Sequence, residues 1–345
     1  MKKVLFATTA LVATTGMAAA EVSFGGFGRF GLVYDEGNDA TAGNDDVRIE
    51  QRFRLTATGT TTSDNGLEFE GRIRFQTDDN ANGSSNVANN SAAGFAVSTG
   101  GFRLDVGHVS DVLDSGDVVD YYGYGVGLTS SIEQSSGFGL PASGFGTGSD
   151  DIAPTVKLRY TVGDFTVSAS ITDDARVGGV PADAADNGTL DAQLVAAGAA
   201  QGDDIEREEY QIGFGYNFGN YSVGVAFGNE DADAFTTETD TSTASIDNDF
   251  YALSFGGEIG ALAFSILIAD YDANDDTSYG FSVKYDVGAA TEIRFAFADT
   301  GVDDEDEVYG IGFQHSLGGG VSLRGGVGQL QDGDTFADLG VVFNF

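Results

Sequence analysis

The chain of 345 residues contains no cysteine, so neither a disulfide framework nor thiol chemistry is available to it. It also lacks tryptophan and has only two histidines, His108 and His315. Neither histidine has a nucleophile partner in a recognisable motif, which argues against a histidine-based hydrolytic site. We therefore expect a protein that is not an enzyme.

Long hydrophobic runs are missing as well. After residue 20, no stretch approaches the ~18 consecutive apolar residues that a membrane-spanning helix needs. Hydrophobic residues still make up 41% of the chain. If the protein spans a bilayer, it does so with strands that turn one face to lipid and the other to water, and this fits an ordinary apolar content.

Positive charge is scarce. Lys and Arg number 16 against 54 Asp and Glu, for a formal net charge of −38. Such a charge repels phosphates and excludes nucleic acid as a natural partner. No cofactor is required, but weakly bound Ca²⁺ or Mg²⁺ could bridge acidic connections to outer-membrane lipid and lipopolysaccharide. The alternative is that clusters such as residues 303–307 are simply solvated.

The start of the chain has the pattern of an export signal. Lys2 and Lys3 form a short basic region, residues 4–13 are mildly apolar, and residues 18–20 are the small residues that signal peptidase cuts. We expect a cleaved signal peptide over residues 1–20 and a single domain over residues 21–345. Loss of Lys2 and Lys3 changes the formal charge from −38 to −40.

The rest of the chain alternates apolar and polar residues with the period of a strand. In residues 47–57 the apolar side chains fall mainly on odd positions and the charged ones on even positions, and residues 67–76 repeat this design. About sixteen segments have strand character: 22–34, 47–57, 67–76, 94–99, 102–107, 155–162, 165–173, 208–218, 221–229, 249–256, 261–271, 277–287, 291–299, 307–317, 321–330 and 336–345. An even number is what a bacterial single-chain barrel requires.

The connections alternate between two kinds. Short glycine-bearing turns occupy residues 99–101, 163–164, 219–220, 288–290 and 318–320. Long acidic connections occupy residues 35–46, 77–93, 108–154, 174–207 and 230–248. This alternation predicts an all-β fold, a transmembrane antiparallel β-barrel with short periplasmic turns and long external loops in the bacterial outer membrane. The last strand, which ends at Phe345, is expected to pair with the first.

Seven arginines fall on the polar positions of the first five predicted strands. Since neighbouring strands lie ~4.8 Å apart, their guanidinium groups are expected to form one positive surface on the lumen side, which we call the basic wall. Its members are Arg29, Arg48, Arg52, Arg54, Arg72, Arg74 and Arg103.

The longest early connection supplies candidate counter-charges. If residues 108–154 fold into the lumen, their carboxylates would face the basic wall and set a transverse field across a narrow eyelet. The candidates are Asp111, Asp114, Asp117, Asp120, Glu133, Asp150 and Asp151. The alternative for any one of them is a solvated surface acid.

Four stretches carry a family resemblance: residues 18–21, 60–69, 218–224 and 337–345. With them, the chain resembles the Gram-negative general diffusion porins, particularly their alphaproteobacterial branch. The resemblance implies a sixteen-stranded homotrimeric barrel whose third external loop folds inward, and residues 108–154 match that loop in position. Residues 139–144, centred on Pro141, look like its tip.

Together these features predict a passive, water-filled channel for small hydrophilic solutes and ions. The charge of −40 and the acidic external loops predict a weak preference for cations. Two alternatives stay open. One is an outer-membrane enzyme, and the other is an exported acidic calcium-binding β protein or adhesin, for which the lipid-compatible alternation would be coincidence.

Overall fold

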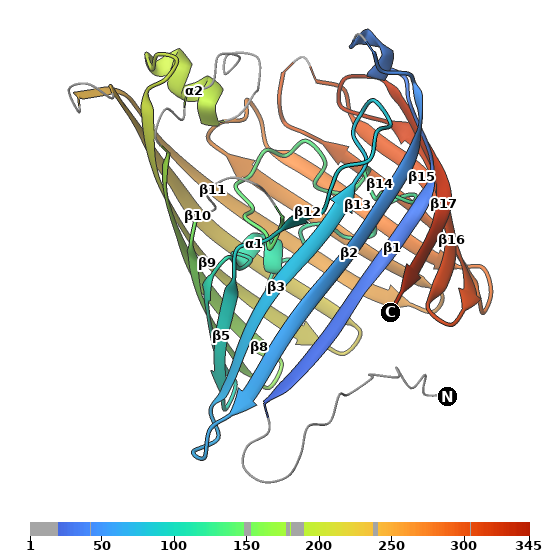
Figure 1. The fold of residues 1–345 in the computed structure, drawn as a ribbon, viewed down its shortest axis with the longest axis horizontal. Helices are drawn as coiled ribbons and strands as arrows, with labels where there is room; N and C mark the ends of the chain where they lie inside the picture. Colours follow the sequence, from blue (N-terminus) through green and yellow to red (C-terminus); the bar gives the residue numbers. More distant parts are fainter. Residues whose placement is uncertain are drawn as a thin grey trace.

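The computed structural model describes residues 20–41, 43–147, 153–176, 180, 190–236, 241–303 and 305–345, and its strands close into a barrel (Figure 1). The expected signal peptide lies outside these residues except for Ala20. The strands in the described part are β1 Glu21–Asp35, β2 Val47–Thr62, β3 Glu68–Asp78, β4 Asn89–Asn90, β5 Gly94–Thr99, β6 Phe102–Gly107, β7 Thr155–Val162, β8 Phe165–Arg176, β9 Asp204–Phe218, β10 Tyr221–Thr236, β11 Thr241–Ile259, β12 Leu262–Tyr271, β13 Ser278–Asp286, β14 Thr291–Asp299, β15 Val308–Gly318, β16 Val321–Gln329 and β17 Thr335–Asn344. β4 has only two residues; the others confirm an antiparallel barrel of about sixteen strands.

The barrel closes where its first strand meets its last. β1 and β17 pair in antiparallel register from Phe27 opposite Asn344 to Asp35 opposite Phe336. Beyond this ladder, the backbones of Gly26 and Phe345 exchange two hydrogen bonds of 3.1 Å each. Since β1 also pairs with β2, and β17 with β16, the sheet has no free edge to expose to lipid.

Large apolar side chains cover the outside of the barrel. Phe30 is 55% exposed, Ile49 61% and Phe69 43%, whereas inward-facing Val33 is fully buried. An apolar exterior of this kind is what lipid contact requires. No helix in the described residues is long and apolar enough to cross a bilayer.

The turns at one end of the barrel are tight. Gly163 and Gly219 adopt φ values of 58° and 66°, a left-handed conformation that favours glycine. The opposite end carries the long connections, with the short 3₁₀ helix η1 Asn38–Ala40 and the helix α2 Leu190–Ala197 (Figure 1). The sequence did not predict α2.

The expectation of an irregular loop over residues 230–248 was wrong. β10 continues to Thr236, and β11 begins at Thr241. The acids alternate with small residues, and Ala232 and Ala234 are buried on the inward side, where they pack with Leu194 of α2. A strand that extends beyond the bilayer can turn acids outward, so its alternation lacks the apolar face by which the other strands were identified.

Candidate functional site

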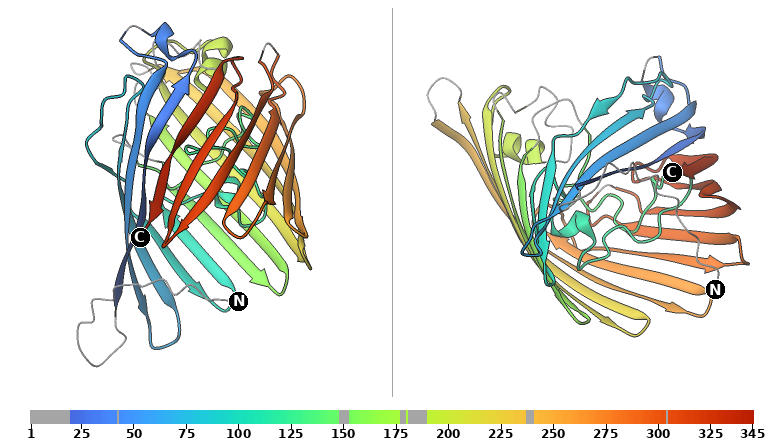
Figure 2. Two further views of the ribbon diagram at one scale, coloured as in Figure 1. Left: turned by 90° about the vertical axis from the view of Figure 1, so that its right-hand side faces the viewer. Right: turned by 60° about the horizontal axis from the view of Figure 1, so that its bottom comes forward.

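Residues 108–147, which we call the inner loop, lie inside the ring of strands (Figure 2). Three backbone amides fix the loop to inward-facing side chains. Asp120 N donates to Ser254 Oγ (3.0 Å), Tyr124 N to Ser282 Oγ (2.8 Å), and Leu128 N to a carboxylate oxygen of Asp338 (2.8 Å). Ser254, Ser282 and Asp338 belong to β11, β13 and β17. Because these strands are spread around the barrel, the inner loop crosses much of the lumen.

The inner loop rests on a surface of small residues, which we call the seat. Its members are the inward-facing Gly224, Ala226, Ala252, Ser254, Ser265, Gly280, Ser282, Ala296, Gly310, Gly312 and Gly326 of β10–β16. A Cβ on Gly224 would lie 1.7 Å from Val118 O, and one on Gly280 would lie 1.9 Å from Gln134 O. The loop backbone therefore approaches the strands at distances that only glycine permits.

Apolar packing and a buried amide complete this contact. Val112, Leu113 and Phe138 of the loop are fully buried in a cluster with Ala226 and Ala252 of the wall. The Gln134 side chain, also fully buried, donates to Ser265 Oγ (3.1 Å) and accepts from Ser282 Oγ (3.0 Å). The polar atoms of Gln134 are thus satisfied and the apolar side chains of the loop are packed against the strands, so the inner loop narrows the lumen.

The structure places all seven arginines of the basic wall on inward-facing positions. Four of them pair with carboxylates of the wall itself or of the connection after β3. Arg29 pairs with Glu50, Arg48 with Asp79 (3.1 Å) and Asp35 (3.8 Å), Arg52 with Asp78, and Arg103 with Glu70 (3.1 Å) and Asp105 (2.9 Å). Much of the positive charge is therefore compensated locally.

The other three, Arg54, Arg72 and Arg74, form no ion pair with a carboxylate in the described part of the chain. Arg54 donates to Gln76 and stacks on Phe27. Arg72 and Arg74 lie over the same ring, Phe145 of the inner loop, at 4.3 and 4.5 Å from its centroid. Arg74 also donates to the Phe145 carbonyl. At this point an aromatic ring and a backbone oxygen join the loop to the basic wall.

The acids proposed for the loop have other neighbours. Asp111 is fully buried and accepts hydrogen bonds from Asp114 N (2.7 Å), Ser143 N and Gln211 Nε2 (3.2 Å). Asp117 binds Lys157 (2.8 Å) and Arg159 on β7. Within the described residues, none of the loop acids forms an ion pair with the seven arginines.

The remaining acids proposed for the eyelet form few hydrogen bonds. Asp114 accepts from the Tyr122 hydroxyl (2.8 Å), and Asp120 accepts from Gly123 N (3.1 Å). Burial, followed by repulsion from Asp120, raises the pKa of Glu133 to about 7. Burial also raises the pKa of Asp111 to about 7, against the backbone amides that favour its charged form. Asp150 and Asp151 lie outside the described residues.

Sequence reasoning missed several lumen groups. Lys157 and Arg159 of β7 share Asp117, while Arg294 of β14 donates to Gly125 O of the inner loop (3.1 Å). Arg324 of β16 also points inward and donates to Ser322 Oγ (3.2 Å). Their inward parity is visible in the sequence, but β7, β14 and β16 are not consecutive strands, so these cations lack the clustering that singled out the basic wall.

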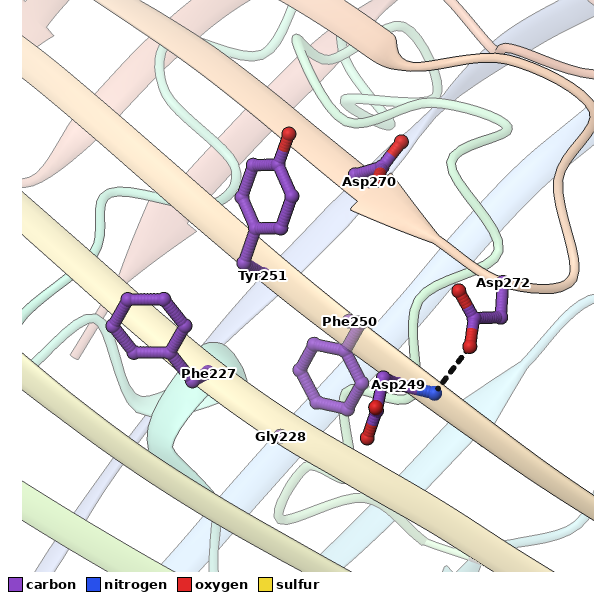
Figure 3. Close-up of a pocket in the computed structure, with 7 residues that line it drawn as sticks. All are labelled: Phe227, Gly228, Asp249, Phe250, Tyr251, Asp270 and Asp272. Atoms are coloured by element: carbon purple, nitrogen blue, oxygen red, sulfur yellow. Dashed lines mark hydrogen bonds between the residues drawn. The ribbon is translucent and has the colours of Figure 1, made fainter.

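A separate pocket of about 370 Å³ lies on the outward face of β10–β12. Phe227 and Tyr251 border it on one side and Asp249, Asp270 and Asp272 on the other, with Asp249 N donating to Asp272 (3.1 Å) (Figure 3). It faces away from the lumen and is not on the path of a solute. Among the described residues, no group of three or more His, Asp or Glu could hold a metal ion.

An antiparallel barrel with an apolar exterior, a charged interior and a loop fixed across its lumen defines a transmembrane channel protein of the outer membrane. Residues 7–335 match the family model of Gram-negative porins, and the chain belongs to this family. The porins of Fuscovulum blasticum and Rhodobacter capsulatus are 28% and 27% identical to it over 335 and 353 residues. Each alignment covers 94% of this chain and 100% of the relative.

Solved structures show the same fold. A variant of the Rh. blastica porin has a TM-score of 0.69 at 24% identity, with 94% of this chain and all of that chain covered. A second variant of that porin has the same TM-score and identity. These findings confirm the predicted family, the barrel and the outer-membrane location.

Proposed function

We propose that the protein is a passive, water-filled channel through which small hydrophilic solutes and ions diffuse, and that it catalyses no reaction. The observation that supports this most directly is the inner loop, which narrows the lumen and is joined to inward-facing side chains of the barrel through the backbone amides of Asp120, Tyr124 and Leu128. A polar lumen of restricted width passes hydrated solutes and retards large or apolar ones.

The channel has a modest preference for cations. The formal charge of −38 and the acids of the external connections support this, because they concentrate cations at the mouth of the lumen. In a planar bilayer with a KCl gradient, we expect a reversal potential of the sign that K⁺ selectivity produces. The preference shrinks at high salt, where surface charge is screened. A reversal potential of the opposite sign contradicts this selectivity.

The assembly we propose is a homotrimer with a cleaved signal peptide over residues 1–20. Both features rest on the family resemblance and on the N-terminal pattern. Weak binding of Ca²⁺ or Mg²⁺ by the acidic external loops, as bridges to lipopolysaccharide, belongs to the same proposal. The mass of the detergent-solubilised protein by light scattering tests the trimer, and N-terminal sequencing of the exported protein tests cleavage before Glu21.

A further inference from the structure

A recess of about 320 Å³ opens in the lumen wall beside α1 Val112–Ser115, the short helix of the inner loop, and we call it the alcove. Its lining is drawn from strands β3, β6 and β7 and from the start of the inner loop. The lining residues are Arg72, Arg103, Asp105, Val109, Ser110, Ser115, Asp117, Lys157 and Arg159.

Positive charge exceeds negative charge in this lining. Four cationic side chains face two carboxylates, an excess of two positive charges. Asp117 is shared between Lys157 Nζ (2.8 Å) and Arg159, so one carboxylate compensates only half of that pair. Attraction to these cations outweighs the effect of burial and lowers the pKa of Asp117, so its carboxylate is already charged and paired at neutral pH.

Hydrogen-bond donors are also left over. Arg72 contacts the Phe145 ring but has no hydrogen-bond acceptor among the described residues, and the Ser110 hydroxyl likewise has no partner there. Arg103 differs, because Asp105 and Glu70 both hold it. Arg72 and the Lys157–Arg159 pair are thus the groups with unused capacity for an anion, and Arg72 presents a planar fork that suits an oxyanion.

The size of the recess and the number of donors favour a particular class of solute. Liquid water occupies about 30 Å³ per molecule, so the alcove has room for a small oxyanion together with several waters. Since Arg72, Lys157 and Arg159 line one recess, an anion with several charged oxygens can accept hydrogen bonds from more than one of them, whereas a monatomic anion offers no set of separate acceptor oxygens.

We propose that the alcove binds small divalent oxyanions, such as phosphate, as they pass through the lumen. This rests on the proposed function, in which the lumen is a solute path. The site gives the channel a local affinity for divalent anions that the overall negative charge of the protein opposes. Chloride, with a single charge and no fork of oxygens, is held much less.

Phosphate binding to the detergent-solubilised protein tests the proposal. In ³¹P NMR at pH 7.5, we expect saturable broadening of the inorganic phosphate line. The variant Arg159→Gln keeps the Lys157–Asp117 pair and, with the loss of one charge-assisted contact, weakens the affinity about tenfold. Arg72→Gln, a second variant from another strand, weakens it similarly.

The matched control is Arg324→Gln. It removes one lumen arginine on β16, far round the barrel from β7, whose only hydrogen bond within the described residues is to Ser322. Its phosphate affinity should remain close to that of the wild type. Absence of saturable broadening in the wild type overturns the proposal, and so does an equal loss in Arg324→Gln, which would show unspecific attraction.

Planar-bilayer recordings separate this inference from the proposed function. Phosphate should reduce the KCl conductance of the wild type saturably and that of Arg159→Gln much less. A conducting channel that binds no phosphate overturns the inference alone. A protein that binds phosphate at these residues but never conducts overturns the channel function and leaves the binding site in place.

Discussion

The seat and the basic wall share the same alternation of inward and outward residues, but they contact the inner loop in different ways. On the seat, the inward positions are Gly, Ala and Ser, and the loop backbone lies directly on the strands. On the basic wall, the inward positions are long charged side chains that mostly pair with one another. Small inward side chains therefore allow the loop backbone to lie directly on the seat, whereas at the basic wall the loop meets the long side chains of Arg72 and Arg74.

The largest effect is expected where the loop lies closest to the seat. Gly224→Ala places a Cβ 1.7 Å from Val118 O, a backbone atom that cannot swing away. Overpacking of this kind costs about 1–3 kcal/mol. We expect the loop to shift toward the basic wall, which narrows the lumen and lowers the single-channel conductance.

The matched control for this substitution is Gly25→Ala, at an inward position where the nearest atom to a new Cβ is Phe345 O at 4.0 Å. It should conduct like the wild type. An unchanged conductance in Gly224→Ala would show that the close contact between the loop backbone and the seat at Gly224 does not hold the loop in position.

An intermediate effect is expected from a buried acid of the loop. Because the pKa of Glu133 is raised to about 7, its neutral form is favoured in the fold. The stability that this form confers is fully present below the unfolded-state pKa and is lost as the pH rises through about 7. Glu133→Gln is neutral throughout, so at pH 8 it should be more stable than the wild type by about 1–2 kcal/mol.

Denaturant unfolding at several pH values measures this difference, which should shrink toward pH 5. Asp120→Asn serves as the companion variant. This variant removes the nearby charge that helps to raise the pKa of Glu133. Its loss of stability with rising pH should therefore end at a lower pH than in the wild type. A stability difference independent of pH would contradict the assignment of the titration to Glu133.

The smallest effect is expected on the basic wall. Arg52 and Asp78 form a partly exposed pair with side-chain exposures of 28% and 29%, and pairs open to solvent contribute only about 0–1 kcal/mol. Arg52→Gln should hardly change stability, but it makes the lumen more negative and shifts the reversal potential in a KCl gradient toward cations. The double variant Arg52→Gln, Asp78→Asn restores the balance of charge. If the reversal potential of the double variant is shifted as far as that of the single variant, Asp78 does not compensate the charge of Arg52 in the lumen.

Much of the fold follows from the sequence because alternation with a period of two reports directly which face meets lipid. This alternation placed the strands and the inward direction of Arg72. It missed the extension of β10 and β11, where the outward positions carry acids instead of apolar residues. The closure of the barrel by β17 was likewise predictable from its pattern.

The partners within the lumen were not predictable from the sequence. Asp117 binds Lys157 and Arg159 on β7, which depends on how the chain returns across the barrel rather than on any local pattern. The seat does leave a signal: small residues recur at the inward positions of β10–β16. Without a structure, however, such residues are equally consistent with an open, water-lined surface.

The seam between β1 and β17 has a consequence for how the protein is made. Its ladder joins the two ends of the chain, so no shorter length of polypeptide can satisfy all of its amides and carbonyls in lipid. A nascent chain that stops short of β17 would bring two rows of bare backbone groups into hydrocarbon. We therefore expect a stable barrel in the membrane only when β17 is present to pair with β1.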